Sequence, residues 1–347
     1  MPFTPAQLVR GADYSLATFE RKTPIDQINI HRVTLDWFMR TKEISTFGNG
    51  SFKEPIYVSN DSNYQNYFGA DQVTYNDRDP ARWTDFGYYN SHDGFWFDED
   101  RLLAAGITLS DDGEATPTTT EREQLVNLLD VSFTSLTNSI QEGLAFELLR
   151  DGSQSAKAVP GLASIVDPTP ATGTVGGINA ALFPYWRNNA NLLITPADIV
   201  TEMQDSWDAA MTFGGMVPDF IVAGKAFVDN YRAQAGLTIN REIHAAGNMR
   251  GGVSLDASVS NLYFHGVPVL WDPTFEALDA LLGTTTQTKT AYFLNSKAIK
   301  FRPVKGNWMV NRKPERLPDR YVHYFAKTSK YGLTTNKRNA NAVLSIS

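Results

Sequence analysis

The chain has 347 residues, of which 42% are hydrophobic and 12% aromatic, and its formal net charge is −7. It contains no cysteine, which excludes disulfide frameworks, cysteine nucleophiles and thiolate metal sites. The acidic balance and the absence of a basic block argue against strong or sequence-specific nucleic-acid binding. No apolar stretch approaches the roughly 18 residues of a membrane helix. The length predicts two or three compact units.

Residues 1–44 carry few turn signals. Apolar and polar side chains alternate over residues 28–33 (INIHRV), as is typical of an extended chain that lies on another surface. A local strand or a short helix of the same domain is the alternative, and the two readings have equal weight. We expect an N-terminal arm over residues 1–44.

Residues 45–100 are rich in Asn, Asp, Gly and aromatic residues and show no helical period. Strands are predicted over 52–59 and 88–97, within a long polar-aromatic hairpin or loop that has no core of its own. We therefore expect this extended loop to dock onto a neighbouring subunit; a ligand-binding lid or a carbohydrate-binding face is the alternative. The candidate contact residues are Phe52, Trp83, Phe86, Tyr88, Tyr89, Phe95 and Trp96. All of these except Phe52 are expected to be partly exposed in the isolated subunit.

A long amphipathic helix is predicted between Thr118 and Gly152. Apolar residues recur there every three or four positions, which places them on one stripe of the helix. The stripe consists of Leu125, Leu129, Phe133, Leu136, Ile140, Leu144 and Leu148. Thr118 and Glu121 have the form of a capping box, and Asp151-Gly152 is a plausible stop. Such a long one-sided helix suggests a spine against which β structure lies.

Residues 158–294 show the pattern of an α/β domain. Helices are predicted from Thr195-Pro196 to Gly214, over 225–234 and from Asp272 to Leu282. Strands are predicted over 219–223, 262–265, 267–271 and 291–294. The long glycine-bearing loop 237–258 contains Asn248, Met249, Arg250, Gly251 and Gly252, where glycines permit close approach of several copies around a symmetry axis. A mobile surface loop is the alternative.

The C-terminal part returns to β structure, with strands predicted over 298–304, 308–311, 321–328, 331–335 and 341–347. A charged, proline-stiffened loop spans residues 312–320. Its charged residues are Arg312, Lys313, Glu315, Arg316, Asp319 and Arg320. We expect this loop to exchange salt bridges with symmetry-related copies, with a solvated turn as the alternative.

No catalytic, cofactor or metal site is predicted. The five histidines show no metal-binding helical spacing and accompany no nucleophile motif. Residues 161–165 (GLASI) lack the closing glycine of a nucleophile elbow, and residues 173–177 (GTVGG) lack the lysine of a phosphate loop.

The order of these parts resembles the major capsid proteins of tailed bacteriophages, whose Hong-Kong-phage capsid fold encapsulins share. Short motifs in this sequence carry the resemblance. They are residues 142–147 (EGLAFE), 161–166 (GLASIV), 175–179 (VGGIN), 185–189 (YWRNN), 218–224 (PDFIVAG) with Tyr231, 267–271 (VPVLW) and 337–340 (KRNA). The resemblance covers residues 40–347.

The resemblance implies an α+β capsid fold with an N-terminal arm (1–44), an extended β loop (45–100), a peripheral domain containing the spine helix (101–157 and 295–335) and an axial domain (158–294 and 336–347). It also implies a non-enzymatic protein without cofactors that self-assembles into hexamers and pentamers of an icosahedral virion shell, formed in the host bacterial cytoplasm. The shell encloses double-stranded DNA without sequence-specific binding. A portal and a scaffolding or decoration protein are the implied partners, and no membrane is involved. An encapsulin-like compartment and an α/β enzyme with an aromatic lid are the alternatives.

Overall fold

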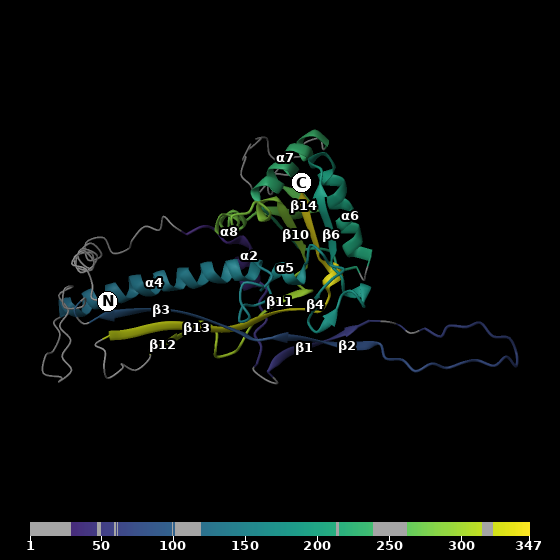
Figure 1. Ribbon diagram of the computed structural model, residues 1–347, viewed down its shortest axis with the longest axis horizontal. Helices are drawn as coiled ribbons and strands as arrows, with labels where there is room; N and C mark the ends of the chain where they lie inside the picture. The colour runs from purple at the N-terminus through teal and green to yellow at the C-terminus, as the bar shows by residue number, and fades with distance from the viewer. Residues whose placement is uncertain are drawn as a thin grey trace, which may run out of the picture. The chain divides into compact units, whose positions relative to one another are not determined.

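The computed structural model describes residues 29–46, 50–58, 60, 62–98, 100, 119–212, 215–238, 262–313 and 322–347. It is a mixed helix-and-sheet fold, as predicted (Figure 1). The chain divides into two compact units. The smaller unit contains Met1–Ile30, Asn90–Leu144 and Val304–Lys330, and the larger unit contains His31–Tyr89, Ala145–Pro303 and Tyr331–Ser347.

The predicted spine helix is present as α4 (Thr119–Leu149). Among its described side chains, Leu136, Ile140, Leu144 and Leu148 are buried, and they are all members of the predicted stripe. The helix ends just before Asp151-Gly152, as predicted, and Gly152 has a φ of 91°, which L-residues with a side chain rarely adopt.

The smaller unit packs α4 against three members of a four-stranded sheet, and Figure 1 shows α4 running alongside two of them. The strand β13 (Val322–Thr335) pairs with β3 (Tyr89–Asp98) and with β12 (Val310–Arg312). The rings of Phe95, Phe133 and Phe325 meet at centroid distances of 5.3–5.7 Å, in the range of favourable aromatic pairs. The strands predicted separately over 321–328 and 331–335 are therefore one continuous strand.

The larger unit is built on a six-stranded sheet with the order β6-β14-β10-β7-β9-β8. Its strands are β6 (Asn189–Ile194), β7 (Phe220–Ala223), β8 (Tyr263–Phe264), β9 (Val267–Trp271), β10 (Thr290–Leu294) and β14 (Ala342–Ile346). The strand β10 is antiparallel to both neighbours, whereas the pairs β14–β6 and β7–β9 are parallel. The buried strands β7 and β10 explain the unbroken apolar runs over 220–223 and 291–294.

The helices α6 (Ile199–Thr212), α7 (Lys225–Thr238) and α8 (Thr274–Leu282) accompany this sheet, all three in predicted positions. The core includes Ile199, Met203 and Trp207 from α6, which recur every four residues on one face of that helix. The β8–β9 hairpin turns at His265-Gly266, and both residues have positive φ angles, as a two-residue hairpin loop of type I′ requires. Gly283 has a left-handed conformation and ends α8.

Shorter elements complete the larger unit. They are α5 (Leu162–Ile165), β4 (Thr174–Val175), β5 (Ile178–Asn179), β11 (Ile299–Pro303) and the 3-10 helices η1 (Pro184–Trp186), η2 (Pro196–Asp198), η4 (Gln287–Lys289) and η5 (Arg338–Ala340). The strand β11 pairs with residues 331–335 of β13.

Within the predicted arm over residues 1–44, the alternative of a short helix holds for residues 33–40, which form α2 (Val33–Arg40) instead of an extended chain. Its Leu35 and Phe38 are buried, and the ring of Trp37 stacks on Phe220 at 4.8 Å. These apolar residues at helical spacing outweigh the short alternation that precedes them, since they gain a core to pack against. Residues 1–28 of the predicted arm lie outside the described part of the chain.

The predicted extended loop over 45–100 divides into two parts. The strand β1 (Ser51–Tyr57) pairs with β2 (Ala81–Gly87) in an antiparallel hairpin, whereas β3 pairs with β13. The strand β2 was not predicted, because charged and polar residues interrupt its sequence ARWTDFG. The hairpin therefore consists of residues 51–87, and β3 belongs to a different sheet.

Candidate assembly surfaces

The β1–β2 hairpin has one buried and one exposed face. On one face, Phe52 pairs with Phe86, and Ile56 lies on the same side; all three are buried. On the other face, Pro55 is opposite Trp83, while Tyr57 is opposite an alanine. Trp83 is 65% exposed and Tyr57 is 82% exposed, so this face presents apolar surface to the surroundings.

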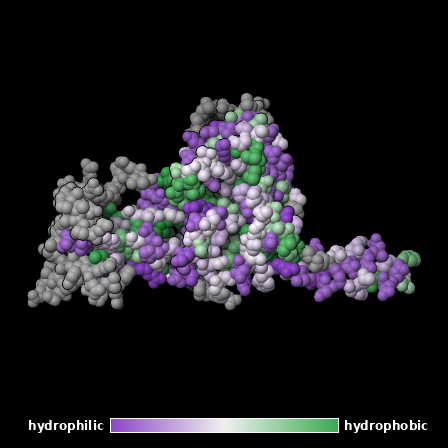
Figure 2. All heavy atoms as spheres, in the orientation of Figure 1, coloured by the Kyte–Doolittle hydropathy of each residue, from purple (hydrophilic) through white to green (hydrophobic). Residues whose placement is uncertain are grey.

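Beyond β1 and β2 the hairpin continues as a long two-armed extension (Figure 1). The arms are tied by hydrogen bonds from the side chains of Asn63 and Gln65 to Thr74, and the chain reverses at a turn between Phe68 and Asp71. Four more aromatic side chains are strongly exposed on this extension: Tyr64, Tyr67, Phe68 and Tyr75. Figure 2 shows hydrophobic atoms at the end of an otherwise mainly hydrophilic segment. Because a solvated hairpin gains nothing from such residues, they indicate a surface that becomes covered.

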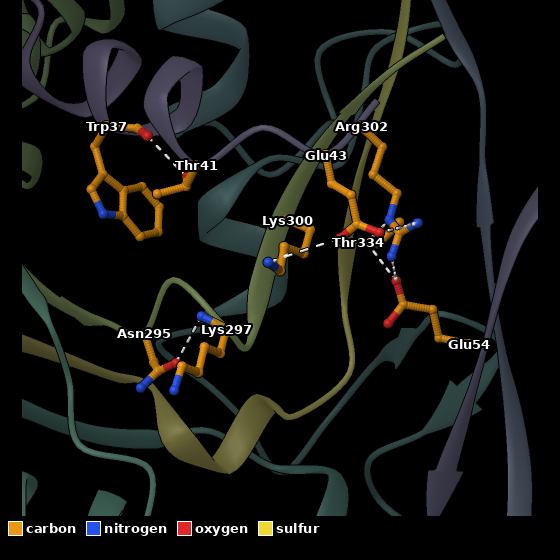
Figure 3. Close-up of polar contacts among 9 residues, drawn as sticks. All are labelled: Trp37, Thr41, Glu43, Glu54, Asn295, Lys297, Lys300, Arg302 and Thr334. Carbon is orange, nitrogen blue, oxygen red and sulfur yellow. Dashed lines mark hydrogen bonds and ion pairs between the residues drawn. The ribbon is translucent and has the colours of Figure 1, made fainter. Parts of the chain in front are cut away.

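The root of the hairpin is fixed to β11 and β13 through Arg302 (Figure 3). The guanidinium of Arg302 lies 2.5 Å from Oε1 of Glu54 on β1, and it donates through Nε to Oγ1 of Thr334 at 3.0 Å. It also lies 5.8 Å from the ring centroid of Phe52, a cation–π distance. The carboxylate of Glu54 accepts a second bond from Thr334 Oγ1 at 3.0 Å. These bonds hold β1 on the sheet formed by β11 and β13.

The same arginine also meets the segment that follows α2. Glu43 lies 3.6 Å from Arg302 and 3.8 Å from Lys300, and its backbone N–H donates to the carbonyl of Phe301 at 2.9 Å (Figure 3). Arg302 therefore holds two acidic side chains, one from the segment after α2 and one from the hairpin.

A second contact supports the hairpin from the glycine-rich turn between β4 and β5. The N–H of Asp85 donates to the carbonyl of Gly176 at 2.9 Å. A Cβ on Gly176 would lie 2.7 Å from the ring of Phe86, and the φ of Gly176 is 57°. Glycine is required here both for the backbone conformation and for the close approach of the aromatic ring.

The β4–β5 turn is itself anchored to a buried arginine, Arg338. Arg338 is 1% exposed and donates to the carbonyls of Ile165 (2.7 Å) and Trp186 (2.9 Å) and to Oδ1 of Asn188 (3.0 Å). Trp186 donates through Nε1 to the carbonyl of Val175 in β4 at 2.9 Å. Burial lowers the pKa of Arg338 to about 10, although the charge of Asp167 acts in the opposite direction. The group therefore stays charged at neutral pH.

The Arg338 cluster brings together four of the motifs on which the sequence resemblance rests: 161–166, 175–179, 185–189 and 337–340. Their shared feature is thus the packing of irregular backbone around one cation. Sequence reasoning named the motifs but missed the role of Arg338. It also missed Glu43, Glu54 and Arg302, whose pairing spans more than two hundred residues.

The structure separates the predicted contact residues of the extended loop. Trp83 and Trp96 are exposed, and Tyr88, Tyr89 and Phe95 are half-buried. The prediction that Phe86 is partly exposed is wrong, since Phe86 is 8% exposed and packs against the β4–β5 turn. Phe52 is also buried, with its ring 4.2 Å from that of Tyr88. These inward-facing residues anchor the hairpin rather than offer a contact.

The predicted axis loop, residues 248–252, lies outside the described residues. Of the charged loop, Arg312 and Lys313 are described and exposed, whereas Glu315, Arg316, Asp319 and Arg320 lie outside the described part. Arg312 ends β12 and donates to Oγ1 of Thr328 at 3.1 Å, and Lys313 lies over the ring of Phe325 at 5.9 Å. The loop is flanked by strands β12 and β13, as predicted.

Two features of the described residues bear on other functions. No group of three or more His, Asp or Glu side chains there is arranged to hold a metal ion. None of the helices in the described ranges is long and apolar enough to cross a membrane.

Comparison with solved structures gives strong matches to phage capsids over nearly the whole chain. The capsid asymmetric unit of cyanophage A-1(L) matches with a TM-score of 0.61 at 14% identity, covering 93% of this chain and 94% of that chain. The capsid of Myoviridae phage XM1 matches with a TM-score of 0.57 at 12% identity, covering 94% and 95%. The chain has the phage capsid fold. A capsid protein of a native GTA particle has the same fold, with a TM-score of 0.52 at 10% identity over 94% and 95% of the two chains. No protein-family model matches the sequence, and no curated protein matches it either.

Proposed function

We propose that this protein is the major capsid protein of a tailed bacteriophage and that it self-assembles into the icosahedral shell around the double-stranded DNA genome. The observation that carries the proposal is the capsid fold, which extends over 93% of the chain. This fold points to a structural protein rather than an enzyme, and it supports self-assembly into capsomers, hexamers and pentamers in the virion. A portal and a scaffolding or decoration protein are proposed as further partners, with assembly in the host cytoplasm.

The hairpin is the proposed means of joining subunits. Its root is fixed by Arg302 and by the β4–β5 turn, whereas its outer face and extension carry exposed aromatic residues. A pre-oriented, amphipathic extension loses little entropy when it docks, so its burial contributes efficiently to assembly. We propose that the exposed face bearing Pro55, Tyr57 and Trp83 lies on a neighbouring subunit in the shell.

The net charge of −7 supports a shell that encloses DNA without adhering to it. An encapsulin-like compartment, which would have the same fold without a genome, is the second candidate. Packaged nucleic acid in particles from infected cells would favour the phage shell, and a protein cargo in particles that lack nucleic acid would favour the compartment.

Electron microscopy of the purified protein tests the proposed function directly, because a shell protein forms closed particles. The matched variant replaces residues 60–78 with Asn-Gly, a sequence suited to a tight hairpin turn. This change retains β1, β2 and the bond from the N–H of Val58 to the carbonyl of Pro80. We expect a folded subunit that forms no shells. Normal particles from this variant would show that the extension is not required for assembly.

Two further surfaces are proposed from the sequence. We propose that residues 248–252 meet around the capsomer axes and that the charged loop 312–320 forms salt bridges between capsomers. Reversing Arg316 and Arg320 to Glu should lower shell yield and change its salt dependence while leaving the subunit melting temperature unchanged. Unchanged shells with an unchanged salt response would assign the loop to a solvated turn.

A further inference from the structure

One edge of the six-stranded sheet is open. The edge strand β6 pairs with β14 on one side, and no described strand pairs with it on the other. Leu192 and Leu193 on this strand are 42% and 76% exposed. Leu193 also has a φ of 57°, an unfavourable conformation for a leucine, which glycine or asparagine would adopt more readily. A free surface disfavours an exposed apolar residue with a strained backbone on an open strand edge. Such a residue is typical of a surface that becomes covered by another molecule.

The helix next to this edge is acidic. The helix α6 packs on β6, and Figure 1 shows the two side by side. Asp198, just before the helix, and Glu202, Asp205 and Asp208 within it follow one another at helical spacing, and α6 contains no lysine or arginine. Asp198, Glu202 and Asp208 accept hydrogen bonds from the neutral side chains of a threonine, an asparagine and a glutamine. Their negative charge is therefore not neutralised within the described part of the subunit.

A second surface of the larger unit has complementary properties. The helix α8 lies there, across the sheet from α6 in Figure 1, and its Leu281 and Leu282 are 63% and 42% exposed. The short helix η4 contacts both α8 and α7, and it contributes Lys289. Lys225 is exposed at the first position of α7, directly after Gly224, which packs against η4. Neither lysine forms an ion pair with a described residue.

We propose that these two sides form the contact between neighbouring copies of this chain around a capsomer ring. The acidic edge (Leu192, Leu193, Asp205 and Asp208) of one copy would bind the basic edge (Lys225, Leu281, Leu282 and Lys289) of the next copy. Two different patches on one subunit generate a ring, because each copy uses both. Exposed leucines meet leucines, and unpaired carboxylates meet unpaired ammonium groups. The inference rests on the proposed shell function and names the surfaces that would join subunits within a capsomer.

Charge reversal tests the pairing. The first variant carries Asp205→Lys and Asp208→Lys, and the second carries Lys225→Glu and Lys289→Glu. The helix dipole tolerates these changes, because they place a lysine toward the C-terminus of α6 and a glutamate at the N-terminus of α7. Each variant alone brings like charges together at every contact in the ring. We expect capsomer yield to fall by about tenfold or more in each, with the subunit melting temperature unchanged.

Combining the two variants gives outcomes that a general loss of stability cannot produce. A single chain with all four reversals has complementary edges again, so it should recover closed shells. A mixture of the two separate variants has complementary contacts only when they alternate, which an even-numbered ring permits and a five-membered ring does not. The mixture should therefore form hexamers and open assemblies but no pentamers. Failure of the fourfold variant to recover capsomers would overturn the proposed pairing.

Two controls separate this inference from the proposed function. Lys305→Glu reverses an exposed charge in the smaller unit and should leave assembly unchanged. Leu193→Gly relieves the strained backbone and removes the apolar contact, so it should maintain or raise the melting temperature while lowering capsomer yield. If the unaltered chain forms no particles, either alone or in infected cells, the shell function itself is wrong. If it forms shells that neither reversal affects, only this contact is wrong.

Discussion

Replacing Arg302 with Met should loosen the hairpin without unfolding the subunit. The substitution keeps an unbranched side chain but removes the bonds to Glu54, Glu43 and Thr334. The side chain of Glu54 is only 12% exposed, so the change leaves a largely buried carboxylate that still accepts a hydrogen bond from Thr334. Breaking a fully buried pair costs about 3–5 kcal/mol, and partial exposure reduces this to about 2–3 kcal/mol here. The pair with Glu43, whose side chain is 51% exposed, contributes about 0–1 kcal/mol.

Double-mutant cycles in the unassembled subunit can measure the interaction energies of Arg302 with Glu54 and with Glu43. Arg302→Met is combined with Glu54→Gln in one cycle and with Glu43→Gln in the other, and urea unfolding gives the free energies. We expect a coupling of about 2 kcal/mol with Glu54 and below about 1 kcal/mol with Glu43. Added salt should weaken only the exposed pair with Glu43. Faster proteolysis within residues 58–80 of Arg302→Met, with the rest of the chain intact, would show that the loss is local. Equal couplings with the two glutamates would refute the assignment of Arg302 as the anchor of the hairpin.

Three further perturbations address the supports of the fold. Arg338→Met should lower the free energy of unfolding by about 3–5 kcal/mol, because it removes the donors that pair with buried carbonyl groups. Arg338→Lys should recover part of the lost stability. A loss below about 1 kcal/mol in urea unfolding would contradict the role of Arg338 as a buried anchor. Burial raises the pKa of Asp279, but hydrogen bonds from Thr284, Thr288 and Gln287 outweigh it and lower the pKa below its usual value. The stability that Asp279 contributes is therefore present above about pH 4. The difference in the free energy of unfolding between the unaltered protein and Asp279→Asn should shrink as the pH falls below that value. Gly161→Ala should destabilise by about 1–3 kcal/mol in thermal unfolding, since its Cβ would lie 2.5 Å from two backbone carbonyl oxygens; an unchanged melting temperature would contradict that crowding.

Regular elements were predictable because their signal is local. The stripe of α4 recurs every three or four residues from Leu125 to Leu148, and the apolar runs of β7 and β10 need no partner to be recognised. The strand β2 was missed, and the helix α2 was only one of two readings, because their signals are short and only tertiary contacts decide between competing local states. The stacking of Trp37 on Phe220 and the fit of Phe86 against Gly176 join segments that the sequence separates widely.

The candidate assembly surfaces show the same division. The sequence identified the aromatic extended loop and the charged loop as contact regions, because their composition lacks a core of its own. It could not separate Phe86, which faces inward, from Trp83, which faces outward, because the pairing register of β1 and β2 determines the side on which each lies. It also could not show that Glu43 and Glu54 share Arg302, or that Arg338 gathers four motifs.

By itself, therefore, the sequence determined the order of parts, the long helix, most strands and helices of the larger unit, and the absence of cysteine chemistry. The tertiary structure alone decided which aromatic residues remain exposed, which charges are paired, and which sides of the sheet are acidic and basic. The physical reason is that the helix and strand periods repeat within a few neighbouring residues of the sequence, whereas burial and ion pairing depend on which distant segments the completed sheets bring together.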